Sequence, residues 1–382
     1  MQVYLVGGAV RDGLLGIPVV ERDWVVLDAT EADMRTRGFV AADQAFPVFL
    51  HPENGEEYAL ARREIKRGEG YRGFEVYAGP DVTLEEDLRR RDLTINAMAQ
   101  DQAGNIFDPY GGRADLEAGL LRHVSEAFVE DPVRVLRIAR FAAKLGEQGF
   151  HVAHETQRLM RHMVETGGMR HLAAERLWRE MMRAMQAAQP WRFFEVLHGC
   201  AALKDLISPL AGAMGEPKAH KVLDDSPPVA ALKRMAAVSV DPAQRLAAVL
   251  LPCVDSRSDV EKLAALIRAD RETAQLLKRA VAGRAAYKLA GEGDVDALLD
   301  LMGLWRGFDA GSDIAAPLAV CEAQSARPVV GGYLRLALPA ALAVSVEDLR
   351  RQGLAGAELG RRLTGARREA MRAALRVAGL LT

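Results

Sequence analysis

The spacing of hydrophobic and polar positions changes about a third of the way along the chain. Before residue 113, short apolar runs end at glycine, proline and charged residues, which predicts strands over 3–6, 21–27, 47–52, 56–62 and 106–109. Two helices are expected among them, a short one over 9–16 that Gly16 closes and a longer one over 84–99. The segment 63–75 is charged and rich in glycine, which predicts a mobile loop.

Beyond residue 113, the apolar positions recur with the period of an α-helix. This pattern predicts helices over 132–145, 155–165, 174–188, 191–198 and 229–251, and a helical tail over 346–382. The proline- and glycine-rich segment 208–228 is expected to be a linker or an ordered loop. We therefore predict an α+β fold, in which a small mixed β-sheet with flanking helices precedes an all-helical remainder.

Composition narrows the protein class only slightly. The 382 residues are 49% apolar and 27% charged, as in ordinary globular proteins, and the net charge of −2 neither favours nor excludes a nucleic-acid partner. Three scattered cysteines indicate buried or incidental thiols in a reducing cytosol. The sequence predicts neither a signal peptide nor a membrane span, because its apolar runs are shorter than ~18–20 residues.

Three carboxylates form the first candidate site. Glu21 and Asp23 are two residues apart on a predicted strand, so both side chains should leave the same face. Glu57 begins another strand and would complete the cluster. Carboxylates together with substrate phosphates are the usual ligands of Mg²⁺, and two such ions ~3.5–4 Å apart promote phosphoryl transfer. The structural alternative is an exposed polar strand edge.

Two further features could bind phosphate. Gly7 and Gly8 lie between a strand and a helix, where the backbone can approach an anion, and Arg11 lies just inside that helix. Arg91 and Asp92 belong to an RRRD sequence on the second predicted helix, and we expect them to lie near one another. An ordinary tight turn and a solvated basic face are the respective structural alternatives.

The order of these features identifies a family resemblance. The segments LVGGAVRDGLLG, RDWVV, FPVFLHP, EEYALAR, LRRRDLTINA, DPYGG and EDPVRVLRIARFA resemble the class II tRNA nucleotidyltransferases, and within them the CCA-adding enzymes of proteobacteria. The resemblance covers roughly residues 1–205. It implies a nucleotidyltransferase head over 1–112, a helical neck over 113–207 and a helical body and tail over 208–382. It also implies tRNA, CTP and ATP as substrates and Mg²⁺ as cofactor, in the cytoplasm.

The resemblance assigns roles to individual positions. It implies that Glu21 and Asp23 bind the metal and that Glu57 is the third catalytic carboxylate. It implies nucleotide contacts at Gly8, Arg11, Arg91, Asp92, Arg137 and Arg140. A solvated basic face is the alternative for Arg137 and Arg140. Segment 63–75 falls on the flexible loop that helps the family switch from C to A addition.

The segment EDPVR over 130–134 is the predicted base-reading motif. Asp131 and Arg134 are spaced to share one helical face, and the resemblance implies that they pair with the incoming base. A carboxylate accepts from the amino group of C or A, whereas U and G present a carbonyl there. A structural role is equally clear, since Asp131 before Pro132 is suited to capping a helix. Both roles can hold together.

Two departures from the family pattern affect the expected function. Position 21 is Glu where the family usually has Asp, which shifts the carboxylate and brings the activity into question. Histidine does not occur after His220, so we expect no HD phosphohydrolase site in the segment AVLLPCVDS over 248–256. We expect the arginine-rich tail to bind RNA backbone, and the alternative is an exposed helix without a function. The alternative functions are those of an enzyme that adds only A, a poly(A) polymerase, or a non-catalytic tRNA-binding protein. The protein is expected to be either a monomer or a homodimer.

Overall fold

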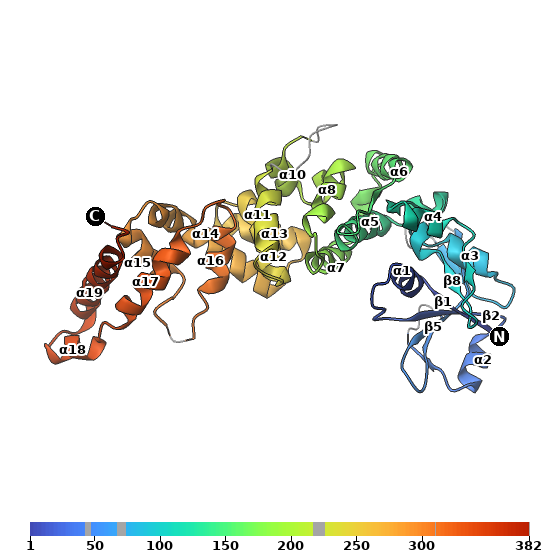
Figure 1. Ribbon diagram of the computed structural model, residues 1–382, viewed down its shortest axis with the longest axis horizontal. Helices are drawn as coiled ribbons and strands as arrows, with labels where there is room; N and C mark the ends of the chain where they lie inside the picture. The colour runs from blue at the N-terminus through green and yellow to red at the C-terminus, as the bar shows by residue number, and fades with distance from the viewer. Residues whose placement is uncertain (43–46, 67–73, 217–225, 310, 382) are drawn as a thin grey trace. The chain divides into compact units, whose positions relative to one another are not determined.

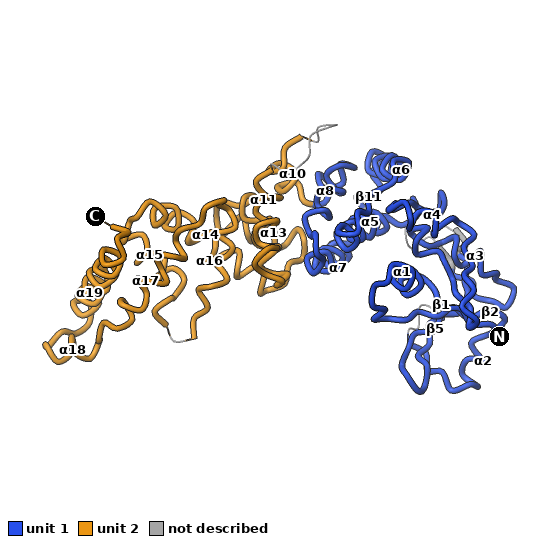
Figure 2. The backbone as a smooth tube through the Cα atoms, viewed as in Figure 1, with its two compact units in different colours: residues 1–206 blue, residues 207–382 orange. Residues whose placement is uncertain are grey.

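The chain divides into two compact units, residues 1–206 and 207–382 (Figure 2). The computed structural model describes residues 1–42, 47–66, 74–216, 226–309 and 311–381. Within these ranges the first unit contains all the strands and the second contains helices (Figure 1). The predicted α+β fold is therefore confirmed. The three-part division at 112 and 207 stays a prediction, although its second boundary lies one residue from the division between the units.

The first unit is built on a seven-stranded mixed sheet with the order β3-β4-β5-β2-β1-β8-β9. Its strands are β1 (Gln2–Val6), β2 (Asp23–Leu27), β3 (Val40–Ala41), β4 (Val48–Leu50), β5 (Glu57–Leu60), β8 (Ala99–Gln100) and β9 (Ile106–Phe107). β2 and β5 run parallel, and their neighbours pair antiparallel. Two smaller pairs are separate from this sheet, namely β6 (Arg63–Lys66) with β7 (Phe74–Tyr77) and β10 (Leu120–Leu121) with β11 (His151–Val152).

The alternation of side chains along β2 explains how the sheet is packed. Val25 and Leu27 point into one apolar cluster that includes Leu88 of α3 (Leu84–Arg89). Val26 points into the other, around Met34 of α2 (Glu31–Thr36). Both faces of the sheet are thereby covered, and the polar residues at the strand ends are left for other roles.

The remaining helices of the first unit form its helical part. They are α1 (Gly8–Leu14), α4 (Gly112–Glu117), α5 (Val133–Lys144), α6 (His154–Glu165), α7 (Ala174–Met185), α8 (Trp191–Gly199) and α9 (Ala202–Leu206), with 3₁₀ turns at Thr94–Asn96, Glu126–Glu130 and Gly168–His171. α5 packs against α7 and α8. The short β10–β11 pair interrupts a region that we expected to be entirely helical.

Several predicted elements have other boundaries. The helix predicted over 84–99 ends at Arg89, and the next residues form a turn in which Asp92 accepts a hydrogen bond from the Leu93 amide at 2.9 Å. The strand predicted over 21–27 begins at Asp23, because Asp23 pairs with Val6, the last residue of β1. The segment predicted as a mobile loop contains β6 and β7, while residues 67–73 lie outside the described residues.

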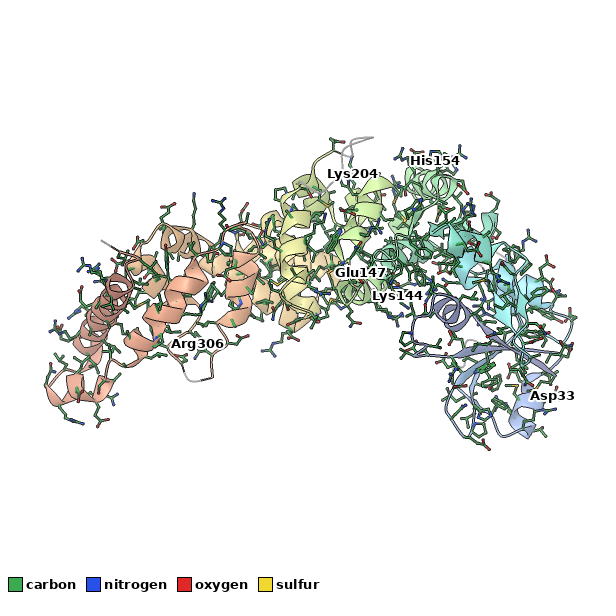
Figure 3. The ribbon with its side chains drawn as sticks, viewed as in Figure 1. Asp33, Lys144, Glu147, His154, Lys204 and Arg306 are labelled. Atoms are coloured by element: carbon green, nitrogen blue, oxygen red, sulfur yellow. The ribbon has the colours of Figure 1, made fainter. Side chains whose placement is uncertain are left out.

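The second unit is a stack of helices. They are α10 (Ser208–Met214), α11 (Pro227–Ala236), α12 (Pro242–Leu250), α13 (Arg257–Ile267), α14 (Arg271–Gly291), α15 (Val295–Leu304), α16 (Ala315–Glu322), α17 (Val330–Leu342), α18 (Val346–Arg351) and α19 (Gly356–Val377), with a 3₁₀ turn at Leu251–Cys253. Trp305 is fully buried against Gly283, where a Cβ atom would lie 2.5 Å from the indole nitrogen. Charged side chains such as Arg306 project from its surface (Figure 3).

The helical boundaries of this unit also differ from the prediction. The single helix expected over 229–251 is two helices, because Asp241 caps α12 through the amides of Ala243 and Gln244. The expected linker over 208–228 contains α10, and residues 217–225 lie outside the described residues. The expected helical tail is divided into α18 and α19 around Gly353, whose φ is +83°.

One stretch contradicts the expectation that apolar runs are too short for a membrane. Residues Val330–Arg351 reach the length and mean hydropathy, 1.2, of a membrane-crossing helix. The stretch comprises α17 and α18, and α17 contains Pro339 and packs against α19. The apolar window of this stretch is 28% buried in the structure.

Candidate active site

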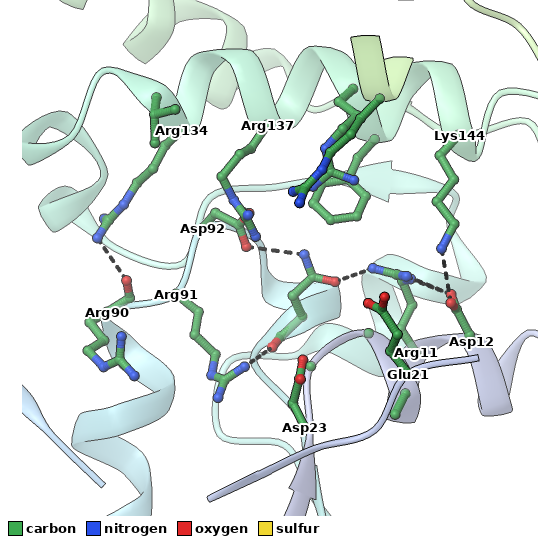
Figure 4. A pocket seen from close by; sticks show the side chains of 18 of the residues that line it. Arg11, Asp12, Glu21, Asp23, Arg90, Arg91, Asp92, Arg134, Arg137 and Lys144 are labelled. Carbon is green, nitrogen blue, oxygen red and sulfur yellow. Dashed lines mark hydrogen bonds and ion pairs between the residues drawn. The ribbon is translucent and has the colours of Figure 1, made fainter. Parts of the chain in front are cut away.

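A cavity of about 1250 Å³ lies in the first unit, between the end of the sheet and helices α5 and α7 (Figure 4). Ten basic and six acidic side chains line it, which gives an excess of four positive charges. Nearly all the sequence-predicted site residues line this cavity: Gly8, Arg11, Glu21, Asp23, Arg91, Asp92, Asp131, Arg134, Arg137 and Arg140. A cavity with this charge suits a polyanionic ligand.

The turn after β1 is fitted closely to an arginine. Gly7 has a φ of +68°, and a Cβ atom there would lie 2.9 Å from Nη1 of Arg91. Arg91 donates to the backbone oxygen of Asn96 at 3.4 Å and pairs with Asp87 at 3.2 Å. Asp87 is fully buried and also binds Arg90 at 2.7 Å. Asp87 therefore holds the Arg91 side chain in place. We expected Arg91 to lie near Asp92, but the ion pair of Arg91 is with Asp87.

Asp23 and Glu21 both line the cavity, and in Figure 4 the Asp23 side chain lies near Arg91 and the Glu21 side chain near Arg11. Burial raises the pKa of Asp23, the charge of Arg91 lowers it, and the charge of Glu21 raises it again. The two carboxylates therefore repel one another. Glu21 precedes β2, so the alternation of side chains along a strand does not explain why Glu21 and Asp23 line the same cavity.

Glu57 is placed differently from the other two carboxylates. Its Cα is the partner of Asp23 across the parallel β2–β5 pair, but Glu57 does not line the cavity. Among the described residues, acidic, histidine and cysteine side chains do not form a group of three or more that could hold a metal ion. The proposed third-carboxylate role of Glu57 stays a prediction.

Glu21 and Asp23 nevertheless suit a divalent cation. Mg²⁺ is usually bound by one or two carboxylates together with substrate phosphates, and it keeps several waters. The electrostatic repulsion between Glu21 and Asp23 is the kind that a bound cation relieves. Two carboxylates in a cavity with surplus positive charge can therefore bind a metal and a polyphosphate together.

A buried chain of polar contacts crosses the back of the cavity (Figure 4). Asp92 accepts from Nε of Arg137 at 2.6 Å and from the side-chain amide of Asn96 at 3.1 Å. The other end of the Asn96 amide accepts from Arg11 at 2.5 Å, and Arg11 pairs with Asp12. Burial by itself would raise the pKa of Asp92, but Arg137 and Asn96 outweigh burial and hold it at about 2.

Helix α5 contributes a second set of contacts at the cavity. The guanidinium groups of Arg140, Arg11 and Arg137 lie 4.3, 5.0 and 5.8 Å from the ring centre of Phe141. Arg140 also pairs with the buried Glu180 of α7 at 2.6 Å. Lys144, at the end of α5 (Figure 3), donates to Asp12 at 3.0 Å.

The predicted base-reading residues both line the cavity but do not bind each other through their side chains. Both oxygens of Asp131 accept from Arg176 of α7 at 3.0 Å, and one also accepts from the Val133 amide at 3.0 Å. The helix begins at Val133 with Pro132 as its N-cap and no side-chain cap, so the predicted assignment of Asp131 as N-cap and Pro132 as the first helical residue is wrong by one position. Arg134 donates to the backbone oxygens of Ala127 at 2.7 Å and Arg90 at 2.8 Å.

The residues that the sequence interpretation missed are mostly partners of residues that it identified. They are Asp87, Asn96, Lys144, Arg176 and Glu180. Arg176 and Glu180 are four residues apart on a segment that we predicted only to be a helix. Polar residues at this spacing on the buried side of the helix could have identified them.

We expected no HD pair in the segment over 248–256. An arginine from another helix contacts this segment. Arg284 of α14 donates to the backbone oxygen of Val254 at 2.6 Å and to that of Leu251, and it pairs with Asp255 at 2.9 Å. A guanidinium therefore satisfies the carbonyl oxygens at the end of this helical turn.

Comparisons with known proteins agree with these features. Residues 3–122 match the family model described as "Poly A polymerase head domain", and residues 149–213 match "Probable RNA and SrmB-binding site of polymerase A". A Pseudomonas putida protein named "CCA-adding enzyme" is 45% identical over 98% of this chain and 99% of its own length. An Aromatoleum aromaticum "Multifunctional CCA protein" is 57% identical over 63% of this chain and 60% of its own length.

Solved structures show the same fold at low sequence identity. A structure titled "The structure of CCA-adding enzyme apo form II" is 22% identical, with a TM-score of 0.71 over 99% of this chain and 92% of that one. The Thermotoga maritima CCA-adding enzyme complexed with tRNA_CCA is 21% identical, with a TM-score of 0.68 over 99% and 91%.

Proposed function

The chain belongs to the family of the CCA-adding enzymes, and from this premise we propose that it adds C, C and A in turn to the 3′ end of tRNA, using CTP and ATP. The observation that carries the proposal is that one cavity holds two carboxylates, a network of arginines, and Asp131 together with Arg134. These are the parts that metal binding, triphosphate binding and base selection require.

The proposed reaction is an attack on the α-phosphate of the bound nucleotide. The 3′-hydroxyl of the tRNA loses its proton to solvent as its oxygen forms a new bond to the α-phosphorus. The bond from that phosphorus to the oxygen that bridges it to the β-phosphate breaks, and pyrophosphate leaves with the electron pair. Glu21 and Asp23 would hold Mg²⁺, which when bound supplies positive charge to the reacting phosphates. Gly7 and Gly8 let the backbone approach the triphosphate, and Arg91 provides positive charge beside it.

Base selection is assigned to the far side of the same cavity. Asp131 accepts a hydrogen bond from the exocyclic amino group of C or A, and Arg134 donates to the adjacent ring acceptor. U and G place a carbonyl against the carboxylate, and each polar group left unpaired costs about 1–3 kcal/mol. Arg137 and Arg140 belong to the nucleotide-binding wall in this proposal, with Asp92 beside the sugar.

The proposal extends to the cellular compartment and to the helical tail. The protein works in the cytoplasm, and its three cysteines are free, as a reducing compartment requires. Its arginine-rich tail contacts the RNA backbone.

The test supplies tRNA that lacks its terminal CCA with CTP alone, with ATP alone and with both. We expect two C residues from CTP alone and a complete CCA from the mixture. Incorporation of A without C would favour an A-adding enzyme, and a long A tract would favour a poly(A) polymerase. Binding of tRNA without any incorporation would identify a non-catalytic protein, and each of these results overturns the proposal.

A further inference from the structure

The carboxylate of Asp131 is held from three directions. Nη1 and Nη2 of Arg176 approach its two oxygens, each at 3.0 Å, in the bidentate arrangement that best fixes a carboxylate plane. The Val133 amide approaches one oxygen at 3.0 Å. The side chains of Arg176 and Asp131 are 28% and 17% exposed, so the pair is partly shielded from water.

This arrangement leaves limited but usable acceptor capacity on Asp131. An ionised carboxylate offers about four lone-pair positions. The two contacts from Arg176 and the one from Val133 occupy three of them. The remaining position accepts one further N–H group, and the carboxylate offers no donor to a carbonyl oxygen.

Arg134 is fixed by different groups. Its two terminal nitrogens donate to the backbone oxygens of Ala127 and Arg90, and it is 8% exposed. A side chain of α7 thus orients Asp131, whereas backbone oxygens of Ala127 and Arg90 accept from Arg134. A change in α7 should reorient the acceptor while the donor stays in place.

We propose that Arg176 is a positioning residue for nucleotide choice, which orients the carboxylate of Asp131 so that it accepts from C and A and rejects U and G. This inference rests on the proposed function. Without Arg176, Asp131 retains only the Val133 amide and turns more freely. A mobile carboxylate accommodates the wrong base at less cost, so discrimination falls more than binding does.

The test compares the kcat/KM for CTP with that for UTP in the full-length enzyme acting on tRNA without CCA. In Arg176→Met the ratio should fall about ten-fold, equivalent to ~1.4 kcal/mol. Arg176→Lys keeps the charge but loses the bidentate geometry, so its ratio should lie between those of Arg176→Met and the natural enzyme. Arg179→Met is the matched control, since Arg179 is exposed on the same helix and does not line the cavity.

The outcomes separate the two proposals. An equal loss of kcat/KM for CTP and UTP would mean that Arg176 only supports the fold, and the inference would be overturned. If Arg176→Met does not fold, the ratio for Arg176→Lys decides, and an unchanged ratio overturns the inference. If the natural enzyme incorporates A but not C, the proposed CCA addition fails, and the ratio of ATP to GTP then tests Arg176.

Discussion

The two units of the chain differ in how much charge their described residues bury. The first buries Arg11, Asp87, Asp92, Arg134 and Glu180, each with an oppositely charged or carbonyl partner. Among the described residues of the second unit, Arg245 is the buried charge, and it donates to the backbone oxygen of Ser239 at 2.7 Å. Buried charge is costly unless it is paired. Its concentration around one cavity therefore indicates that the first unit carries the chemistry and that the second is an apolar scaffold.

The largest expected effect comes from removing a metal-side carboxylate. Asp23→Asn should lower the rate of nucleotide addition by at least ~10³-fold, because a neutral amide binds a divalent cation poorly. Labelled-nucleotide incorporation measures the rate, and thermal unfolding checks the fold. Glu57→Gln is the comparison, since Glu57 lies outside the cavity wall. A smaller loss is expected there, and an equal loss would place Glu57 with the metal ligands.

The ion pair between the buried Asp92 and the partly exposed Arg137 should affect the stability of the first unit. Asp92→Asn removes the largest of the negative charges acting on this guanidinium, which should lower the free energy of unfolding by about 2 kcal/mol. Urea unfolding at pH 7 measures this value. A stability within ~0.5 kcal/mol of the natural protein would contradict the importance of buried pairing in the first unit.

The same pair predicts a pH dependence. The folded-state pKa of Asp92 is about 2, below its ordinary value of 3.8. Its contribution, about 2 kcal/mol, is therefore complete above pH ~4 and is lost as the pH falls towards 2. Unfolding free energies measured between pH 5 and 2 should fall more steeply for the natural protein than for Asp92→Asn. If the two plots of unfolding free energy against pH run parallel, the lowered pKa of Asp92 does not contribute to the stability.

In the second unit, stability should depend mainly on the packing of apolar side chains. Gly283→Ala would place a methyl group 2.5 Å from the indole nitrogen of Trp305, and we expect a loss of about 1–3 kcal/mol of unfolding free energy. Below the melting temperature, the rate of nucleotide addition should be unchanged. Gly303→Ala is the control, because it has open space in α15 and should be neutral or slightly stabilising.

The smallest expected effect concerns the arginine-rich tail. Arg362 and Arg376 are exposed on α19, and reversing both charges should weaken tRNA binding a few-fold. The slope of log affinity against log salt should also become shallower by about 0.7–0.9 for each lost phosphate contact. Filter binding over a salt series measures both quantities. Unchanged affinity and slope would assign the tail to the scaffold alone.

The sequence predicted the class of fold and the wall of the cavity, but not its internal pairing. The spacing of apolar residues located β1, β2 and α5, because the side of each element that is buried carries apolar residues at regular intervals. The helix predicted over 84–99 was wrong beyond Arg89, because long-range contacts of Asp92 with Arg137 override local helical preference. The partnership of Asp131 with Arg176 joins residues 45 apart in sequence, and neither local pattern indicates it.

Nucleotide choice by the cavity itself is the central claim, and a competition experiment tests it most directly. The natural enzyme is given tRNA without its CCA end and equal concentrations of ATP, CTP, GTP and UTP, and the 3′ ends of the products are sequenced. We predict that the extended products end in C, CC or CCA. Products in which U or G appear as often as C or A, or in which A precedes C, would contradict the claim.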